Sequence, residues 1–90
     1  MDTITKTEIT NRGDGVKITE YLSAETGLLH NENEPAVVWK RPDGSIMREE
    51  WFKQNRLHRE DGPAWITYNE DGSVKQSINY INGFKNETDF

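Results

Sequence analysis

The chain has 90 residues, of which 32% are hydrophobic and 30% are charged, and its formal net charge is -5. A chain of this length forms one small domain with a thin core, because about 40% of its unfolded-state surface stays exposed after folding. The acidic balance disfavours direct nucleic-acid binding, since that affinity comes from clustered Lys and Arg. The lack of cysteine excludes disulfides and thiolate metal sites.

The first ten residues, MDTITKTEIT, lack the apolar core of a secretory signal. No stretch of the chain approaches the ~18 apolar residues of a membrane span. We therefore expect a cytoplasmic protein without membrane attachment. Its negative charge favours a basic partner, or a protein that itself binds nucleic acid.

Three pairs of short β-strands are predicted in chain order, each pair joined by a turn that contains Asp-Gly. The pairs are ITKTEIT with VKITEYL around Asp14-Gly15, AVVWK with SIMREEWF around Asp43-Gly44, and AWITYN with SVKQSINYI around Asp71-Gly72. Short runs rich in Val, Ile, Thr, Trp and Tyr between such turns are typical of hairpins. No segment keeps a helical period. The sequence therefore predicts an all-β antiparallel meander of three β-hairpin repeats with about six strands.

The second and third pairs belong to an internal repeat with a period of 28 residues, the separation of His30 and His58. The same offset aligns three groups: Leu29-His30 with Leu57-His58, Pro35-Ala36 with Pro63-Ala64, and Asp43-Gly44-Ser45 with Asp71-Gly72-Ser73. A weaker first copy has two extra residues before its histidine. Repeats of this length are stacked units that bury their apolar faces against their neighbours. We expect a single repeat domain over residues 1–90, with units at about 3–28, 29–56 and 57–85 and a tail at 86–90.

The third turn allows two registers. A two-residue loop pairs Asn69 with Val74, whereas a three-residue loop with left-handed Gly72 pairs Asn69 with Ser73. The second register is preferred because it separates the faces better. One face then carries Ile66, Tyr68, Val74, Ile78 and Tyr80, with Ala36, Val38, Ile46, Phe52, Ile4, Val16, Ile18 and Leu22 from the earlier hairpins. The other face carries Trp39, Trp51, Trp65, Val37, Met47 and Tyr21.

The run EEWFKQNRLHREDGPAWITYNEDGS resembles the MORN-variant repeats of bacteriophages, large viruses and bacteria, which include the YwqK-like antitoxin family. The residues that carry the resemblance are Trp51, Phe52, Asn55, Leu57, His58, Arg59, Gly62, Pro63 and Ala64. The likeness covers Gly27 to Lys85, and it implies a β-hairpin array used for association without implying one activity. The chain departs from the pattern at Arg56, where the family usually has Gly, and at Asn86, which stands in place of His. In the first loop, the Arg and Gly of the pattern are replaced by Asn31, Asn33 and Glu34.

The histidine loops are the first candidates for chemistry. His58 beside Glu60 and Asp61 has the residue types of a general base or a metal ligand. Recurrence at one phase of a repeat favours a structural role, in which the ring nitrogens bond loop backbone and a Gly-Pro pair forms the corner. The predicted structural loop residues are His30, His58, Arg59, Gly62 and Pro63.

Catalysis and metal binding are both disfavoured by spacing and residue type. The two histidines would lie one hairpin apart, roughly 10 Å, which is too far to share a metal. Ser45 and Ser73 follow turn glycines, where serine is ordinary turn chemistry. We predict a protein that is not an enzyme, with no catalytic residues, no metal and no cofactor.

The three tryptophans fit either a core or an interface, since aromatic residues dominate the energetics of both. A sheet of three hairpins has two faces and little else to cover them, so one face must meet a partner protein, a second copy of the chain or a flat ligand. The predicted partner-binding residues are Trp39, Trp51, Trp65, Met47, Val37 and Tyr21.

The leading functional hypothesis is a small non-catalytic binding protein that inhibits or neutralises a protein partner, as an antitoxin or a phage antagonist of a host defence factor. One alternative is a protein that sequesters a nucleotide, with indoles stacked on the base and a cation on the phosphate. The candidate cations are Lys17, Lys40, Arg41 and Arg48. A purely structural repeat module and a homo-oligomer built through open strand edges are further alternatives.

Overall fold

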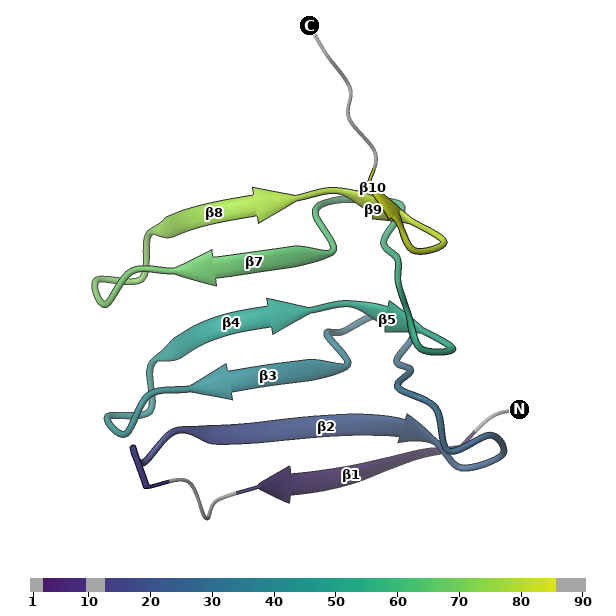
Figure 1. Ribbon diagram of the computed structural model, residues 1–90, viewed down its shortest axis with the longest axis horizontal. Coiled ribbons are helices and arrows are strands. Elements are labelled where there is room, and N and C mark those ends of the chain that lie inside the picture. The colour runs from purple at the N-terminus through teal and green to yellow at the C-terminus, as the bar shows by residue number, and fades with distance from the viewer. Residues whose placement is uncertain (1–2, 10–12, 86–90) are drawn as a thin grey trace, which may run out of the picture.

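The computed structural model describes residues 3–9 and 13–85, and the strands in these ranges form a six-stranded antiparallel sheet in chain order (Figure 1). Its strands are β1 (Ile4–Ile9), β2 (Lys17–Ser23), β3 (Val37–Lys40), β4 (Ile46–Glu50), β7 (Trp65–Tyr68) and β8 (Val74–Ile78). The predicted all-β meander of three hairpins is confirmed. The described residues include no helix long and apolar enough to span a membrane. The predicted tail, 86–90, lies outside the described residues.

Two additional two-stranded ribbons lie at one end of the sheet, beyond β4 and β8 (Figure 1). The first joins β5 (Phe52–Lys53) to β6 (Arg56–Leu57), and the second joins β9 (Tyr80–Ile81) to β10 (Phe84–Lys85). The sequence prediction treated these segments as parts of longer strands or connecting loops. The second and third long hairpins are therefore each followed by a short one, whereas within residues 13–85 β2 is followed only by an isolated bridge between Leu22 and Leu29.

The ribbon turns correct the expected position of the missing glycine. Gln54 and Asn55 both have positive φ, 48° and 68°, as do Asn82 and Gly83 at 50° and 85°. Two-residue hairpin turns require this left-handed backbone at both central positions. Arg56 was predicted to stand in place of a glycine, but it lies in β6 with ordinary strand pairing. Asn55 lies 28 residues before Gly83 and is therefore the equivalent position. Asparagine tolerates the left-handed conformation that both residues adopt.

The turns of the second and third long hairpins adopt the three-residue register predicted for the third. The Asn69 N–H donates to the Ser73 carbonyl over 2.8 Å, and Gly72 has a φ of 91°. The Asp71 carboxylate accepts hydrogen bonds from the hydroxyl and the N–H of Ser73, which hold the pKa of that carboxyl below its usual value. Asp43 has the same two bonds to Ser45. The Asp-Gly-Ser motif is therefore a turn device in both repeats.

Replacing Gly72 by alanine is expected to lower the free energy of unfolding by about 1 kcal/mol, because an L-residue is strained in the left-handed region. A Cβ at Gly72 would meet no atom within 4 Å, so the effect is conformational rather than steric. Gly13→Ala is the matched control, since Gly13 also has open space but no positive φ. Urea unfolding checks the difference. Equal stability of the two variants would contradict the left-handed assignment.

A β-bulge beside the turn in the second and third long hairpins changes which residues share a face. Met47 and Lys75 are the extra residues, so that Trp39 pairs with Arg48, and Thr67 with Gln76. Trp65 consequently pairs with Ile78. The predicted face that grouped Ile78 with Ile66 is wrong, because simple alternation from the turn ignores the bulge.

The register between the first two hairpins produces a second correction. Ile18 pairs with Trp39, and Glu20 pairs with Val37, so Ile18 and Leu22 share the face of Trp39. The sequence prediction that both lie on the opposite face is wrong. We call the side that carries Ile18, Val37, Trp39, Arg48, Trp65 and Ile78 the tryptophan face.

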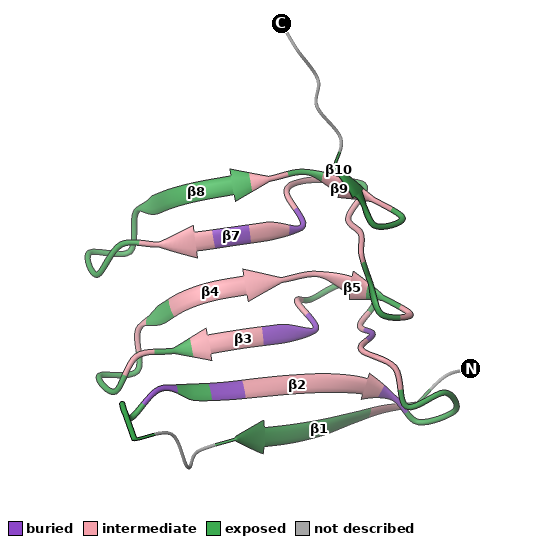
Figure 2. Cartoon of the chain, viewed as in Figure 1, coloured by how far each residue is buried: buried purple, intermediate pink, exposed green. Residues whose placement is uncertain are grey.

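The hydrophobic core is small and lies largely on the tryptophan face. Val16, Ile18 and Val37 are its buried members, and four half-buried side chains pack against them: Leu29, Trp39, Met47 and Phe52. Burial is concentrated in the middle of the sheet, whereas β1 and β8 at its edges are mostly exposed (Figure 2). Ala36 and Ala64, the residues before β3 and β7, are fully buried. No second sheet of comparable size occurs within residues 3–9 and 13–85.

Candidate functional site

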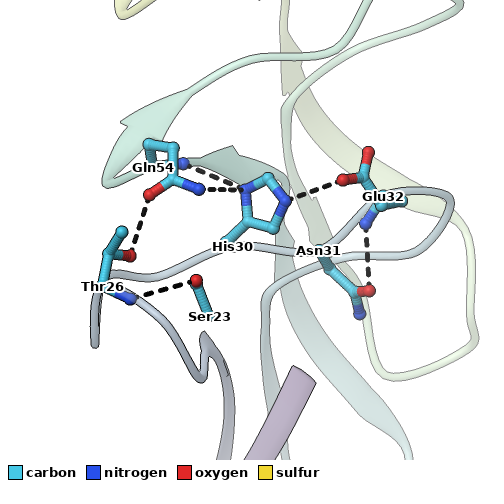
Figure 3. A network of polar contacts seen from close by, with 6 residues as sticks. All are labelled: Ser23, Thr26, His30, Asn31, Glu32 and Gln54. Atoms are coloured by element: carbon cyan, nitrogen blue, oxygen red, sulfur yellow. Dashed lines mark hydrogen bonds and ion pairs between the residues drawn. The ribbon is translucent and has the colours of Figure 1, made fainter. Parts of the chain in front are cut away.

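The loop before β3 is fastened to the first ribbon by a buried histidine. His30 is only 3% exposed, and its Nδ1 accepts a hydrogen bond from the backbone N–H of Gln54 over 3.2 Å (Figure 3). Its Nε2 lies 2.9 Å from the Glu32 carboxylate. Because Nδ1 is an acceptor, the proton of the neutral ring belongs on Nε2, which donates to Glu32. The ring thus uses both nitrogens in holding the loop.

The second histidine repeats the contact 28 residues later. Nδ1 of His58 accepts from the backbone N–H of Asn82 over 2.9 Å, and its Nε2 lies 3.8 Å from Glu60. Gln54 and Asn82 are equivalent, since each is the first left-handed residue of a ribbon turn. Both histidines therefore connect a loop to the ribbon that follows it, and the geometry supports the structural role over a general base.

The side chain of Arg59 organises the loop that leads to β7. Its guanidinium donates to the Asp61 carboxylate over 3.0 Å and to the Pro63 carbonyl over 3.1 Å. A Cβ at Gly62 would lie 3.1 Å from the guanidinium carbon, so glycine permits this close approach. In the earlier loop Asn31 makes the equivalent bond to the Pro35 carbonyl. These contacts place the predicted corner residues in one hydrogen-bonded loop.

Trp51 belongs to this loop rather than to the tryptophan face. The Arg59 guanidinium lies 4.0 Å from the centroid of the indole of Trp51. The backbone N–H of Trp51 donates to the Ala64 carbonyl over 2.7 Å, and the backbone N–H of Tyr21 donates to the Ala36 carbonyl over the same distance. Tyr21 and Trp51 are therefore equivalent positions. The prediction that they share a face with Trp39 and Trp65 is wrong, because the register places Tyr21 on the other side of the sheet from its neighbour Glu20, which pairs with Val37.

The other two tryptophans enclose an arginine on the tryptophan face. The Arg48 guanidinium carbon lies 4.9 Å from the ring centroid of Trp39 and 5.3 Å from that of Trp65. Such cation–π contacts stabilise the arrangement. The Trp39 indole N–H also donates to the Glu50 carboxylate over 3.0 Å. We call Trp39, Arg48 and Trp65 the indole stack.

The electrostatics of the stack are set by partial burial. The Nε of Arg48 is buried and has no hydrogen-bond partner among the described residues. Burial raises the pKa of the Glu50 carboxyl above its usual value, and the Trp39 hydrogen bond and the Arg48 charge oppose this effect.

On the face opposite the indole stack, burial and then the hydrogen bond to Glu49 raise the pKa of Tyr68 to about 12. Tyr68 is therefore a neutral donor at physiological pH.

The structure brings together only part of the predicted partner-binding set. Trp39 and Trp65 are half-buried and adjacent to one another across Arg48, whereas Val37 is 5% exposed within the core. Met47 is the bulge residue and packs against that core. Sequence reasoning did not place Arg48 between two indoles, because its position depends on the bulge. The sequence offers no turn or repeat signal for it, since the residue 28 positions later is Gln76.

Two surface depressions accompany these features. One of about 340 Å³ lies between the histidine loops and is lined by cationic and acidic side chains, including Lys53, Arg59, Glu60 and Asp61. The other, of about 310 Å³, lies beside the indole stack and includes Arg48 and Trp65. Within the described ranges, no group of three or more His, Asp or Glu side chains is arranged to hold a metal ion.

Comparisons with known proteins found no matching family model, no matching curated protein and no matching solved structure. The MORN-variant resemblance therefore stays a prediction.

Proposed function

We propose that the protein is a small non-catalytic binding protein that attaches to a protein partner through the indole stack and neutralises it. The observation that carries the proposal is the pair of half-buried indoles held on either side of the Arg48 guanidinium. Trp and Arg are the residues that most often dominate the binding energy of protein interfaces. The stack is held in place by strand pairing and by the Glu50 bond, so ordering it on binding costs little.

The charge of the chain indicates the chemistry of the partner. The formal net charge is -5, and Glu20 and Glu50 flank Val37 in one row across the tryptophan face. These two carboxylates lie on the β2–β4 part of the tryptophan face, where they complement a basic surface and accelerate its encounter. We therefore propose a basic partner of the kind that handles nucleic acid.

The engagement of the histidines supports a binding role over catalysis. In both histidines Nδ1 accepts a backbone hydrogen bond, which occupies the nitrogen that a general base would use. The resemblance to MORN-variant repeats adds the expectation of an antitoxin-like protein or a phage antagonist of host defence. A cytoplasmic location accompanies this proposal.

Removal of the stack is expected to abolish capture of the partner. A Trp39→Ala, Trp65→Ala double variant should weaken partner binding at least ~100-fold, since each anchor of this kind contributes about 2 kcal/mol or more. Affinity capture from the native host identifies the partner, and calorimetry with the purified partner measures its affinity. Trp65→Ala alone is a second variant, because Trp65 lies outside the core cluster and we expect the protein to fold without its indole.

An Ile46→Ala, Val74→Ala variant serves as the matched control, since both side chains are exposed on the opposite face. It should bind the partner with wild-type affinity. Unchanged binding by the folded Trp65→Ala protein would contradict the proposal. Light scattering that shows a wild-type dimer, converted to monomer by Trp65→Ala, would replace the foreign partner with a second copy of the chain.

A further inference from the structure

The depression of about 310 Å³ beside the indole stack is locally cationic, although the whole chain is acidic. Arg41, Arg48 and Lys75 line it together with Trp65 and Thr67, and its lining includes no carboxylate. This charge is opposite in sign to that of the depression between the histidine loops, which contains several acids. The local charge therefore favours an anionic ligand, although the net charge of the chain favours a basic partner.

Strand register explains why these side chains surround a hollow. Arg48, Thr67 and Gln76 lie opposite one another on β4, β7 and β8. Adjacent strands are ~4.8 Å apart, so the outer two residues of this row are separated by roughly 10 Å at the backbone. Thr67 lies between them, and its short side chain leaves space between the longer side chains of Arg48 and Gln76. Lys75, the bulge residue beside Gln76, adds a cation at the β8 side.

The three cations keep capacity for a ligand. Arg41 donates to the Ser45 hydroxyl and to the carbonyl oxygens of Ile46, Tyr68 and Asn69, which fixes its guanidinium. Its charge helps to lower the pKa of the Asp43 carboxyl, but the two groups form no ion pair among the described residues. Lys75 forms no ion pair among the described residues. Arg48 is neighboured by the charge of Glu50, but its Nε donates to no acceptor among the described residues.

We infer that this depression binds a small phosphorylated molecule, with Arg41, Arg48 and Lys75 facing the phosphate and Trp65 forming an apolar wall beside it. A phosphate monoester carries close to two negative charges at neutral pH, and its oxygens accept hydrogen bonds. It therefore complements guanidinium and ammonium groups, which carry positive charge and only donate. The indole gives the organic part of the molecule, such as a nucleotide base, a surface to pack on. This inference goes beyond the proposed protein-binding role and does not rest on it.

The test is a titration of the full chain followed through the indole N–H signal of Trp65, with four probes in separate experiments. The probes are inorganic phosphate, a nucleoside monophosphate, the same nucleoside without phosphate, and acetate. Both phosphate-bearing probes are expected to shift the Trp65 signal saturably, and the nucleotide should bind more tightly than free phosphate. Saturable binding by the nucleoside or acetate with the affinity of the nucleotide would overturn the inference.

Lys75→Gln is expected to weaken nucleotide binding about 10-fold, since one charge-assisted contact is lost. The side chain of Lys75 is exposed and makes no ion pair, so this variant should keep the wild-type melting temperature. Lys17→Gln is the matched control, because it removes the same charge from an exposed position outside the depression. An equal loss of affinity in both variants, or none in Lys75→Gln, would show that the depression does not recognise phosphate.

Discussion

Replacing His30 by alanine should lower the free energy of unfolding by about 2–4 kcal/mol, because the change opens a cavity and leaves buried polar groups without partners. The imidazole is 3% exposed, and it accepts from the Gln54 N–H and contacts the Glu32 carboxylate. For a domain of this size each kcal/mol corresponds to roughly 4–8 °C in melting temperature. Thermal unfolding followed by circular dichroism measures the shift.

Two variants calibrate that result. Glu32→Ala removes only the exposed end of the contact, since the Glu32 side chain is 64% exposed, and it should cost less than about 1 kcal/mol. His58→Ala should fall between them, because the His58 side chain is 13% exposed and its Nε2 lies farther from a carboxylate. A His58→Ala protein less stable than His30→Ala would contradict this order.

The second large effect is expected at the junction between the second and third repeats. Ala64 is fully buried, its N–H donates to the Ile78 carbonyl, and its carbonyl accepts from the Trp51 N–H. Ala64→Leu adds three heavy atoms where the backbone is bonded on both sides, so we expect a loss of about 1–3 kcal/mol from overpacking. Urea unfolding at constant temperature measures it.

The matched control is Ser77→Leu, since Ser77 is exposed on β8 and pairs with Ile66, two residues after Ala64. This variant should change stability by no more than about 0.5 kcal/mol. Ala36→Leu, at the equivalent position of the preceding repeat, should resemble Ala64→Leu. If Ala64→Leu kept wild-type stability, the junction would have to be looser than its contacts indicate.

The long hairpins could be predicted because their signals are local. Asp43 and Asp71 each accept from the serine two positions later, and the glycine between them supplies the left-handed backbone. The ribbons escaped prediction for a local reason as well. Their strands have two residues each, and the first turn uses Gln54-Asn55 in place of the Asn-Gly that marks such turns. The second turn does contain this signal, as Asn82-Gly83, but the strands on either side of it are too short to show an alternating pattern.

The composition of the faces could not be predicted, because it depends on register rather than on residue type. One bulge residue, Met47, moves Arg48 opposite Trp39, and a second, Lys75, moves Ile78 opposite Trp65. A one-residue shift exchanges the two sides of a strand. The sequence predicts both tryptophans as partner-binding residues, but the position of Arg48 between them follows only from the strand pairing in the structure.

The histidine loops have a structural role, and the proposed binding role belongs to the indole stack. His30 and His58 fasten each loop to the following ribbon through the same ring nitrogen. The paired indoles around Arg48 lie on the tryptophan face, apart from these loop contacts. Stability is accordingly expected to follow the histidines, and partner affinity the tryptophans.

The central claim, that both histidines are structural fasteners, is tested most directly by the tautomers of their rings, measured by nitrogen-15 NMR at neutral pH. We expect His30 and His58 each to hold the proton on Nε2, with an unprotonated Nδ1 that accepts from the backbone of Gln54 or Asn82. Rings that carry the proton on Nδ1, or that exchange freely between tautomers, would contradict the account.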